Sequence, residues 1–399
     1  MRDFPRIVTA ASPGQEDRFY LIDRELEFIP EVKSLLDQKV IGRCSPNTTK
    51  ALCTRLRWYY QFLNQRKLRV LDVKSPDLSD FVLWLSSPYR FHDNQPIPLQ
   101  ASTINQILSA VADLYKFLVR HRYMAESPVV YKSVRRRGKA VVDKDLLAHT
   151  RTQRGHIVQQ MEIRLKEPKS IPKTVLPADF EQFVNRIHIG TNPGADPSGF
   201  RDRLMMLMFR ESGLRCGEML GIRMRDLDFE ASGVHVRFRS DNINGSRAKA
   251  GYGRDRFVHL PLELFGFLDV YLTEVWVNAN RNSDYLWLVL KRNAINGDRR
   301  STFGTPLNRT AVNQMFSYYS RQSGIKIHPH MLRHTHATDL VRSYLRQKDP
   351  VDWKFISDRL GHASVVTTMQ NYVHLTKEDI KKAYDLYWQN KEKANAKRR

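Results

Sequence analysis

Cysteine is scarce in this chain, and its spacing matches no metal or disulfide pattern. Among 399 residues there are three cysteines, Cys44, Cys53 and Cys216, and no two of them form a CxxC pair. This spacing excludes a disulfide framework and a zinc knuckle, and it is typical of a reducing compartment. We therefore expect a cytoplasmic protein, associated with the bacterial nucleoid if its partner is DNA.

Long apolar runs are also missing. No stretch of about 18 apolar residues is present, so we expect no transmembrane helix and no membrane partner. The N-terminal segment MRDFPRIVTAAS has no apolar core, so no secretory signal is expected. Hydrophobic residues still make up 41% of the chain, enough for real cores. At about 150 residues per domain, the length predicts two or three domains.

Acidic residues are also few relative to basic ones. The chain has 42 Asp and Glu against 65 Lys and Arg, which gives a formal net charge of +23. The corresponding pI is about 10.0. Such an excess over a whole chain indicates a polyanionic partner, most often nucleic acid. An anionic membrane surface is the alternative, but no apolar segment supports it.

The first part of the chain predicts a small helical bundle. Residues 1–25 show no clear period and are expected to form an arm, and residues 26–132 carry helical stripes. Ser45–Lys67 begins with Ser-Pro, a cap followed by proline in the first turn. Ser75-Pro76 opens a second helix in the same way, and Ser102 is expected to cap a third. Short loops between such helices favour a bundle.

Basic residues in and after this bundle are candidates for DNA contact. Arg55 and Arg57 lie largely off the apolar stripe of the first long helix, although a solvated face would explain either one alone. Residues 133–172 are expected to form a basic interdomain connector, in which Leu146–Lys166 could be a charged helix. Its basic run contains Arg135, Arg136 and Arg137. Such a run can follow a phosphate backbone, with an ordinary solvated linker as the equal alternative.

The remainder, residues 173–399, predicts a second domain that is mostly helical. Phe200–Glu211 is a strongly apolar helix that Gly213 should end. Val234–Arg239 and Arg256–Leu260 alternate as two strands around a turn rich in Gly and Asn. Further helices are expected at 262–277, 310–323, 331–345, 352–360, 365–374 and 377–391. The predicted fold class is therefore mainly α with a small antiparallel β-sheet (α+β) in this domain.

Four segments of the second domain carry the chemistry-bearing residues. In chain order they are FRESGLRCGEMLGIRMRDLDF, RAKAGYGRDRFVHLP, HPHMLRHTHATDL and DRLGHASVVTTMQNYVHL. Taken together and in this order, they resemble the tyrosine recombinase (phage integrase) family over about residues 173–390. The N-terminal bundle is similar to the family's core-binding domain in architecture. Within the family, the chain looks most similar to transposon-borne members of the transposase A type.

The resemblance implies a catalytic residue set. The matching positions are Arg215 and Arg333 for the two arginines, Glu218 for the acidic residue after the first arginine, Lys249 for the hairpin lysine, His330 and His362 for the two histidines, and Tyr372 for the nucleophile. The family cuts a DNA strand by attack of this tyrosine, leaving a 3′-phosphotyrosyl bond and a free 5′-hydroxyl. A partner strand then reverses the step, with no ATP, metal or other cofactor.

Elementary chemistry supports the cationic part of this set. Attack on a phosphodiester builds negative charge on the non-bridging oxygens, and the planar forks of Arg215 and Arg333 suit that charge. The leaving 5′-oxygen needs a proton, which a lysine on a turn such as Lys249 can supply. Arg247 and Arg254 lie in the same turn, so the choice of Lys249 stays open.

The nucleophile and the histidines need joint support, because each alone has a simpler explanation. Tyr372 keeps the phosphodiester energy as a phosphotyrosyl bond, whereas a lone tyrosine more often packs in a core. His330 could accept the tyrosine proton, and His362 could donate to a phosphate oxygen. A metal cluster of His328, His330, His334 and His336 is the alternative, but carboxylate and thiolate ligands are sparse nearby.

Several questions stay open at the level of sequence. The resemblance implies a homo-oligomer on DNA, from dimer to four protomers on two sites, with the helix at 376–391 docked on a neighbour or on its own domain. A type IB topoisomerase, a telomere resolvase and a non-catalytic DNA-binding protein of the same fold are the rival functions. The recognition sequence, the direction of recombination, the oligomeric state off DNA, the carrier element and any accessory transposition proteins cannot be read from the sequence.

Overall fold

The computed structural model divides the chain into two compact units, residues 1–169 and 170–399. It describes residues 5–10, 17–87, 99–136, 156–167, 173–188, 193–246, 255–280, 282–290, 303–347, 349–362 and 364–369. Within these ranges, no helix is both long enough and apolar enough to cross a membrane.

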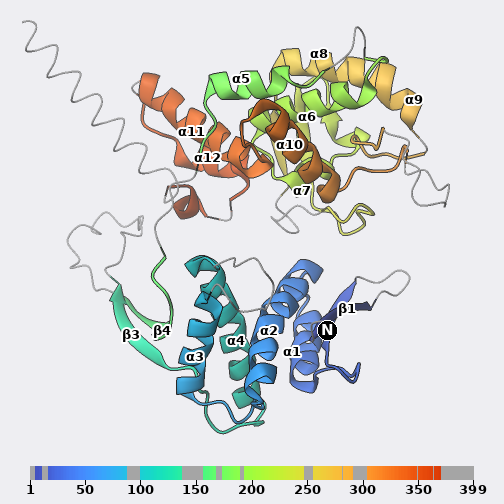
Figure 1. Cartoon of the computed structure of the whole chain (residues 1–399). Helices are drawn as coiled ribbons and strands as arrows, with labels where there is room; N and C mark the ends of the chain where they lie inside the picture. Colours follow the sequence, from blue (N-terminus) through green and yellow to red (C-terminus); the bar gives the residue numbers. More distant parts are fainter. Residues whose placement is uncertain are drawn as a thin grey trace, which may run out of the picture. The chain divides into compact units, whose positions relative to one another are not determined.

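Helices form the body of the described part of the first unit (Figure 1). They are α1 (Pro30–Ile41), α2 (Pro46–Arg66), α3 (Ser75–Ser86) and α4 (Ala101–Arg120). The two long helices pack on each other through Tyr59 and Tyr115, which are fully buried. Their hydroxyls lie 2.5 Å apart, and Tyr115 donates to the Val70 carbonyl at 2.9 Å. The expected helical bundle is therefore present.

The starts of these helices test the predicted caps. Ser45 caps α2, because its Oγ accepts from the Thr48 amide at 3.3 Å, and Pro46 follows in the first turn. The predicted cap at Ser102 is wrong. Gln100 is the residue before α4, and its carbonyl already accepts from the amides of Thr103 and Ile104. The first turn therefore closes before Ser102, which lies inside the helix.

Two paired β-strands occupy part of the expected N-terminal arm. Strands β1 (Arg6–Ala10) and β2 (Arg18–Ile22) pair antiparallel, with Val8 opposite Tyr20. The side chain of Leu21 is 1% exposed and belongs to the apolar core that α1 and α2 build. The expectation of an arm over residues 1–25 is therefore wrong for these strands, because burial of β2 in the helical core orders them.

A second hairpin occupies part of the expected connector. Strands β3 (Tyr131–Arg136) and β4 (His156–Met161) pair antiparallel (Figure 1). Beyond β4, Leu165 is held to α4 by two bonds with the Asn105 amide side chain, each of 2.9 Å. The prediction of a charged helix over residues 146–166 is therefore wrong at residues 156–161, which form a strand. Pairing with residues distant in the chain decides their conformation.

The second unit is a set of helices with one three-stranded antiparallel sheet. Its helices are α5 (Pro177–Asn185), α6 (Pro197–Ser212), α7 (Cys216–Leu220), the 3-10 turn η1 (Met224–Asp226), α8 (Leu262–Val270), the π-helical turn η2 (Tyr271–Trp276), α9 (Val277–Ala279), α10 (Arg309–Ser323), α11 (Pro329–Gln347) and α12 (Trp353–Leu360). Its strands are β5 (Leu227–Asp228), β6 (Gly233–Val236) and β7 (Arg256–His259), in the order β5-β6-β7. The predicted mainly α fold with a small antiparallel sheet is confirmed.

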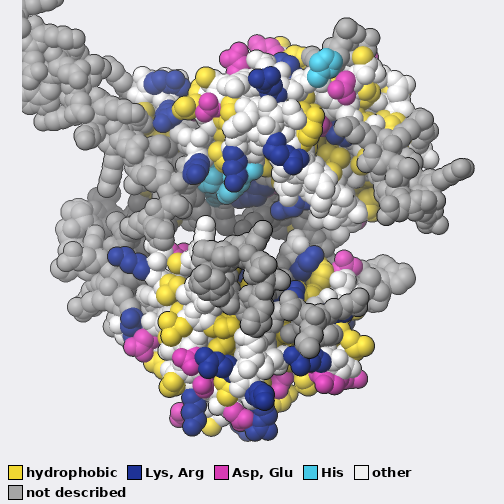
Figure 2. All heavy atoms as spheres, in the orientation of Figure 1, with side chains coloured by type: hydrophobic (Ala, Val, Ile, Leu, Met, Phe, Trp, Pro, Cys, Tyr) yellow, Lys and Arg dark blue, Asp and Glu magenta, His cyan; other side chains and the backbone are white. Residues whose placement is uncertain are grey.

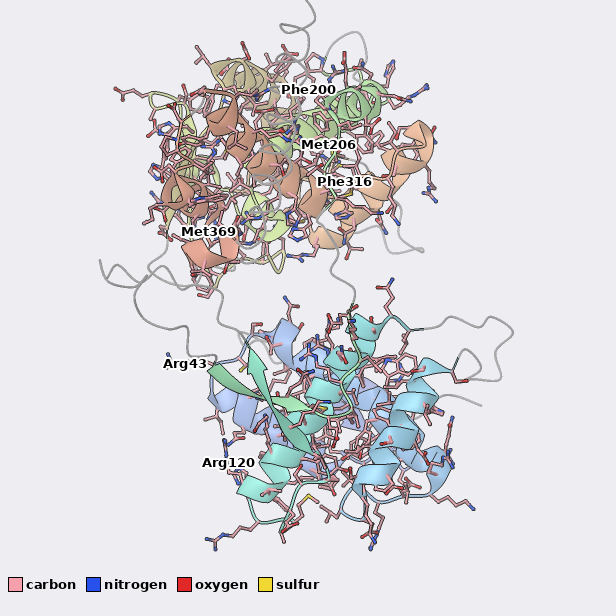
Figure 3. The ribbon with its side chains drawn as sticks, turned by 90° about the vertical axis from the view of Figure 1, so that its left-hand side faces the viewer. Arg43, Arg120, Phe200, Met206, Phe316 and Met369 are labelled. Carbon is pink, nitrogen blue, oxygen red and sulfur yellow. The ribbon has the colours of Figure 1, made fainter. Side chains whose placement is uncertain are left out.

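The core of this unit lies around α6. Met206 is fully buried and Phe316 of α10 is 2% exposed; together with Phe200, both are labelled in Figure 3. Gly213 ends α6 as predicted, with φ of +63°. Strand β6 stops at Val236, short of the predicted Arg239, because Phe238 bonds to the Asp255 side chain instead of continuing the ladder.

Candidate active site

Arg215 and Glu218 are placed by a single turn of chain. After Gly213 the chain leaves α6, and Arg215 becomes the residue before α7. The Glu218 carboxylate accepts from the backbone amide of Arg215 at 2.9 Å through Oε2. The same carboxylate accepts from Nη1 of the Arg215 side chain at 2.9 Å through Oε1. Local capping geometry thus orients the first arginine.

Glu218 is a buried carboxylate shared by several arginines. Its side chain has no exposed surface, and Arg256 of β7 donates to Oε1 at 3.2 Å and to Oε2 at 2.8 Å. Nη1 of Arg333 lies 4.0 Å from Oε2. Burial acts to raise the pKa of Glu218, but Arg256 and Arg215 outweigh it and hold that pKa below its usual range. Glu218 therefore stays ionised and holds the arginines in place.

Arg333 joins the ends of two helices. It lies on α11 with its side chain 4% exposed. Its Nη1 donates to the Gly213 carbonyl at 2.7 Å, and its Nη2 donates to the Leu360 carbonyl at 2.5 Å. Because C-terminal carbonyls of helices lack partners within the helix, a guanidinium satisfies both ends at once. The second arginine is therefore anchored to the backbone at the ends of α6 and α12.

Two histidines lie one turn apart on the same helix as Arg333. Nε2 of the exposed His330 lies 3.1 Å from Nε2 of His334, with ring centroids 4.3 Å apart. Burial, with His330 and Arg333 nearby, lowers the pKa of His334 to about 4. His334 is therefore neutral near pH 7, and the nitrogen that faces His330 can either donate to it or accept from it, depending on the tautomer. On the surface of this unit, histidine side chains lie among Lys and Arg side chains (Figure 2).

His362 follows the turn that ends α12. Gly361 has φ of +63° and closes the helix, and Nη2 of Arg215 donates to its carbonyl at 3.1 Å. Nδ1 of His362 lies 2.7 Å from Oγ1 of Thr368, which is fully buried. Burial, together with the nearby charges of Arg333 and Arg215, lowers the pKa of His362 to about 4. The imidazole is therefore neutral near pH 7 and leaves its other nitrogen for a phosphate oxygen.

His336 serves structure rather than chemistry. Its Nδ1 lies 3.1 Å from the Arg210 carbonyl, and its Nε2 accepts from Nε of Arg359 at 3.0 Å. Burial, with Arg359 adjacent, lowers the pKa of His336 to about 3. Arg359 also donates to the carbonyls of Glu211 and His259. His336 thus bridges α6 and α12. Among the described residues, no group of three or more His, Cys, Asp and Glu side chains could hold a metal ion.

The contacts bring part of the predicted site together. Arg215, Glu218, Arg333 and His362 meet at the junction of α6, α7, α11 and α12, and His330 lies one turn before Arg333. Lys249 and Tyr372 lie outside the described residues. Arg256 and Thr368 were not predicted as site residues, and His334 was considered only as a metal ligand. Only Arg256 had a visible signal, an arginine opening the strand after the Lys249 turn.

The structure describes the side-chain contacts of only some of the predicted DNA-binding arginines. Nη2 of Arg55 donates to Oε1 of Gln106 at 2.7 Å, which joins α2 to α4 at the surface. Nε of Arg57 is buried and has no hydrogen-bond partner among the described residues. Arg135 and Arg136 lie on β3 with undescribed side chains, and Arg137 lies outside the described residues. Other basic side chains of this unit, Arg43 and Arg120, are labelled in Figure 3.

The chain is similar to known recombinases over nearly its whole length. The phage integrase family matches residues 175–379, and the phage integrase N-terminal SAM-like domain matches residues 37–122. Transposase A from transposon Tn554 of Staphylococcus aureus is 30% identical over 381 residues, covering 94% of this chain and 95% of that protein. Tyrosine recombinase XerA of Thermococcus onnurineus is 30% identical over 220 residues, covering 55% of this chain and 64% of that protein.

Solved structures share the fold. The Tn1549 transposon integrase in complex with transposon right end DNA superimposes with a TM-score of 0.56 at 17% identity, covering 90% of this chain and 99% of that chain. The XerH site-specific recombinase bound to a palindromic difH substrate gives a TM-score of 0.54 at 15% identity, covering 90% of this chain and 88% of that chain. By sequence and by fold, the chain belongs to the phage integrase family, the tyrosine recombinases that cut and rejoin DNA.

Proposed function

We propose that this recombinase moves a mobile element by site-specific strand exchange, with Tyr372 as the nucleophile. The observation that carries the proposal is the convergence of Arg215, Arg333 and His362 around the Glu218 carboxylate. His362 is bonded to Thr368, in the helical turn that leads toward Tyr372 in the sequence. The near full-length similarity to a transposon transposase supports a transposon-borne role.

The two arginines divide the work on the phosphate. The Arg215 side chain is 24% exposed and uses Nη1 on Glu218 and Nη2 on the Gly361 carbonyl, so its remaining N–H groups can donate to a non-bridging oxygen. The Arg333 side chain is nearly buried and its donors hold backbone carbonyls. Its permanent charge still acts on the phosphorane, because low-dielectric surroundings strengthen charge interactions. Arg215 contacts the phosphate directly. Arg333 stabilises the phosphorane through its charge and holds the ends of α6 and α12 in place.

Histidines and a lysine handle the protons. His330, paired with His334, accepts the proton of the Tyr372 hydroxyl as that oxygen attacks phosphorus. His362, neutral near pH 7, donates a hydrogen bond to a phosphate oxygen. Lys249 then protonates the departing 5′-oxygen, which leaves a 3′-phosphotyrosyl bond and a free 5′-hydroxyl. No metal or other cofactor is needed, because side-chain cations balance the charge.

The rest of the chain holds the substrate. Arg55 and Arg57 on α2, and the run Arg135, Arg136 and Arg137, bind phosphates of double-stranded DNA. Each protomer cleaves one strand, so exchange between two duplexes requires four protomers on DNA. Accessory transposition proteins would act on this assembly. We propose that the enzyme acts in the cytoplasm, at the nucleoid, where its substrate lies.

A suicide substrate tests the nucleophile directly. A nick placed next to the cleavage position lets the 5′-hydroxyl fragment diffuse away, so the wild-type protein should accumulate as a covalent adduct on the 3′-phosphate. Tyr372→Phe removes only the attacking oxygen and should bind DNA normally without forming the adduct. Tyr344→Phe, on α11 in the same unit, is the matched control and should still form it.

Peptide mapping of the trapped adduct should place the nucleotide between Gln370 and His374. An adduct that persists in Tyr372→Phe would refute the assignment of the nucleophile, and a 5′-linked adduct would refute the chemistry itself. Because a type IB topoisomerase would relax supercoiled plasmid lacking a recognition site, relaxation of such a plasmid by the wild-type protein would refute site-specific exchange.

A further inference from the structure

We propose that Arg256 is a positioning residue for strand cleavage, and this inference rests on the proposed function. Arg256 shares the Glu218 carboxylate, so that Arg215 keeps part of its guanidinium for the scissile phosphate. It also ties the β6–β7 hairpin to the turn that carries His362. No part of the residue set predicted from sequence includes Arg256.

Arg256 connects three segments that are far apart in the chain. It is the first residue of β7, opposite Val236 of β6, and it follows the turn whose sequence contains Lys249. Its two Nη atoms donate to the two oxygens of Glu218 on α7. Its Nε donates to the carbonyl of Arg359 at 3.0 Å, in the last turn of α12. One side chain therefore joins the hairpin, the first arginine's helix and the His362 turn.

The contact with the His362 turn is unusually close. A Cβ atom on Gly361 would lie 2.6 Å from Nη1 of Arg256 and 2.8 Å from its Cζ. The guanidinium therefore packs directly on the Gly361 backbone, while Arg215 bonds to the Gly361 carbonyl at 3.1 Å. Gly361 is held between the two arginines, and the next residue is His362. A shift of Arg256 would therefore shift the His362 backbone as well.

Competition for one carboxylate explains why Arg256 matters for Arg215. A carboxylate and an arginine often pair through two parallel bonds, which would turn a second N–H group of Arg215 onto Glu218 and pull Nη2 away from the Gly361 carbonyl. Here Arg256 makes two bonds to the Glu218 carboxylate, whereas the side chain of Arg215 makes a single bond to it, at 2.9 Å. Without Arg256, the buried Glu218 charge would lose a partner and draw Arg215 inward. The phosphate would then lose the more exposed of the two arginines.

The first test measures single-turnover cleavage of the nicked substrate at saturating protein. Arg256→Gln should cleave about 10- to 100-fold more slowly than the wild type, the range expected when a reacting group is misplaced by about 1 Å. DNA affinity should stay nearly unchanged, because the Arg256 side chain is 10% exposed and faces Glu218. Arg237→Gln is the matched control, an arginine near the same hairpin that is 41% exposed and lies 3.8 Å from Asp226.

The second test separates positioning of Arg215 from general damage. A substrate with a methyl group in place of one non-bridging oxygen has no negative charge at the scissile phosphate. Its transition state carries one negative charge fewer than that of the normal phosphate, so less depends on Arg215, and the rate difference between wild type and Arg256→Gln should shrink markedly on this substrate. A rate difference of equal size on both substrates overturns the proposal, since a merely structural defect would not depend on phosphate charge.

Further outcomes are equally decisive. Wild-type rates in Arg256→Gln would also overturn the proposal. If Arg256→Gln fails to fold, Arg256→Lys keeps the charge but cannot bind both carboxylate oxygens with parallel bonds, so the same slowing and the same dependence on phosphate charge are expected of it. If the wild-type protein itself cleaves neither substrate, the proposed function fails first, which distinguishes that failure from failure of the Arg256 role.

Discussion

Gly213→Ala should destabilise the second unit well beyond the effect of an ordinary helix-ending glycine. Gly213 has φ of +63°, a conformation that costs a non-glycine residue about 1–2 kcal/mol. A Cβ atom there would also lie 2.7 Å from Cδ2 of His336 and 3.3 Å from Cδ2 of Leu360. His336 is held at both ring nitrogens by Arg210 and Arg359, so it cannot move aside without breaking a bond.

The size of the effect follows from these two contributions. Overpacking of a filled core typically costs about 1–3 kcal/mol. Added to the backbone cost, this gives a loss of about 2–5 kcal/mol in the free energy of unfolding. Gly324→Ala is the matched control, because Gly324 also ends a helix with positive φ, +72°, but a Cβ there meets nothing within 4 Å. Only the backbone cost of about 1–2 kcal/mol should appear in that variant.

Urea unfolding followed by tryptophan fluorescence measures both variants, since Trp287 is buried in this unit. Equal losses in Gly213→Ala and Gly324→Ala would show that the contact with His336 costs nothing and would refute the reasoning. In a His336→Ala background the two substitutions should become similar, because the clash is gone. Gly213→Ala should also slow cleavage, since the Gly213 carbonyl anchors Arg333.

Four further predictions concern pH, catalysis, salt and metal. The pKa of His336 is lowered from 6.5 to about 3, so only the unfolded chain gains this proton as the pH falls between those values. The free energy of unfolding should therefore decline on acidification through that window, and His336→Asn should flatten the decline in urea titrations at each pH. Lys249→Ala should slow cleavage more than it weakens DNA binding. A substrate with a 5′-bridging sulfur should restore the cleavage rate of this variant, because a thiolate leaves without a proton. If the rate is not restored, another residue is the general acid. DNA affinity should fall steeply with salt in a binding titration, given the +23 charge, and a salt-independent affinity would contradict phosphate binding. Cleavage should persist in EDTA, whereas a loss reversed by added metal would revive the histidine-cluster hypothesis.

Local signals were predictable from the sequence. Ser45 before Pro46 gave the start of α2, and Gly213 gave the end of α6, because capping depends on a few adjacent residues. The order and spacing of the motif residues around Arg215 and Arg333 indicated the family. Both kinds of signal depend on residue type and neighbouring positions, which a sequence states directly.

Non-local contacts were not predictable in the same way. Strands β1 to β4 were missed because each pairs with a segment separated from it by several residues or more, and neither partner alternates clearly. The contacts of Arg256 with Glu218, and of His336 with Arg359, join residues that are 38 and 23 positions apart. The sequence places Arg256 at the start of a predicted strand, but nothing near it in the chain shows which carboxylate its side chain reaches.

Gly361 shows that some residues of a family motif are required for folding and others for catalysis. Gly361 has a positive φ of +63°, and a Cβ atom there would lie 2.6 Å from Nη1 of Arg256, so this position favours glycine. A copy of this gene that had lost its nucleophile would still need the glycine to fold, whereas it would no longer need Tyr372. An intact Gly361 in a degraded copy would therefore indicate that the fold is retained, whereas only an intact tyrosine would indicate that catalytic activity is retained. Surveys of decaying mobile elements can separate foldable from active copies by reading these two positions independently.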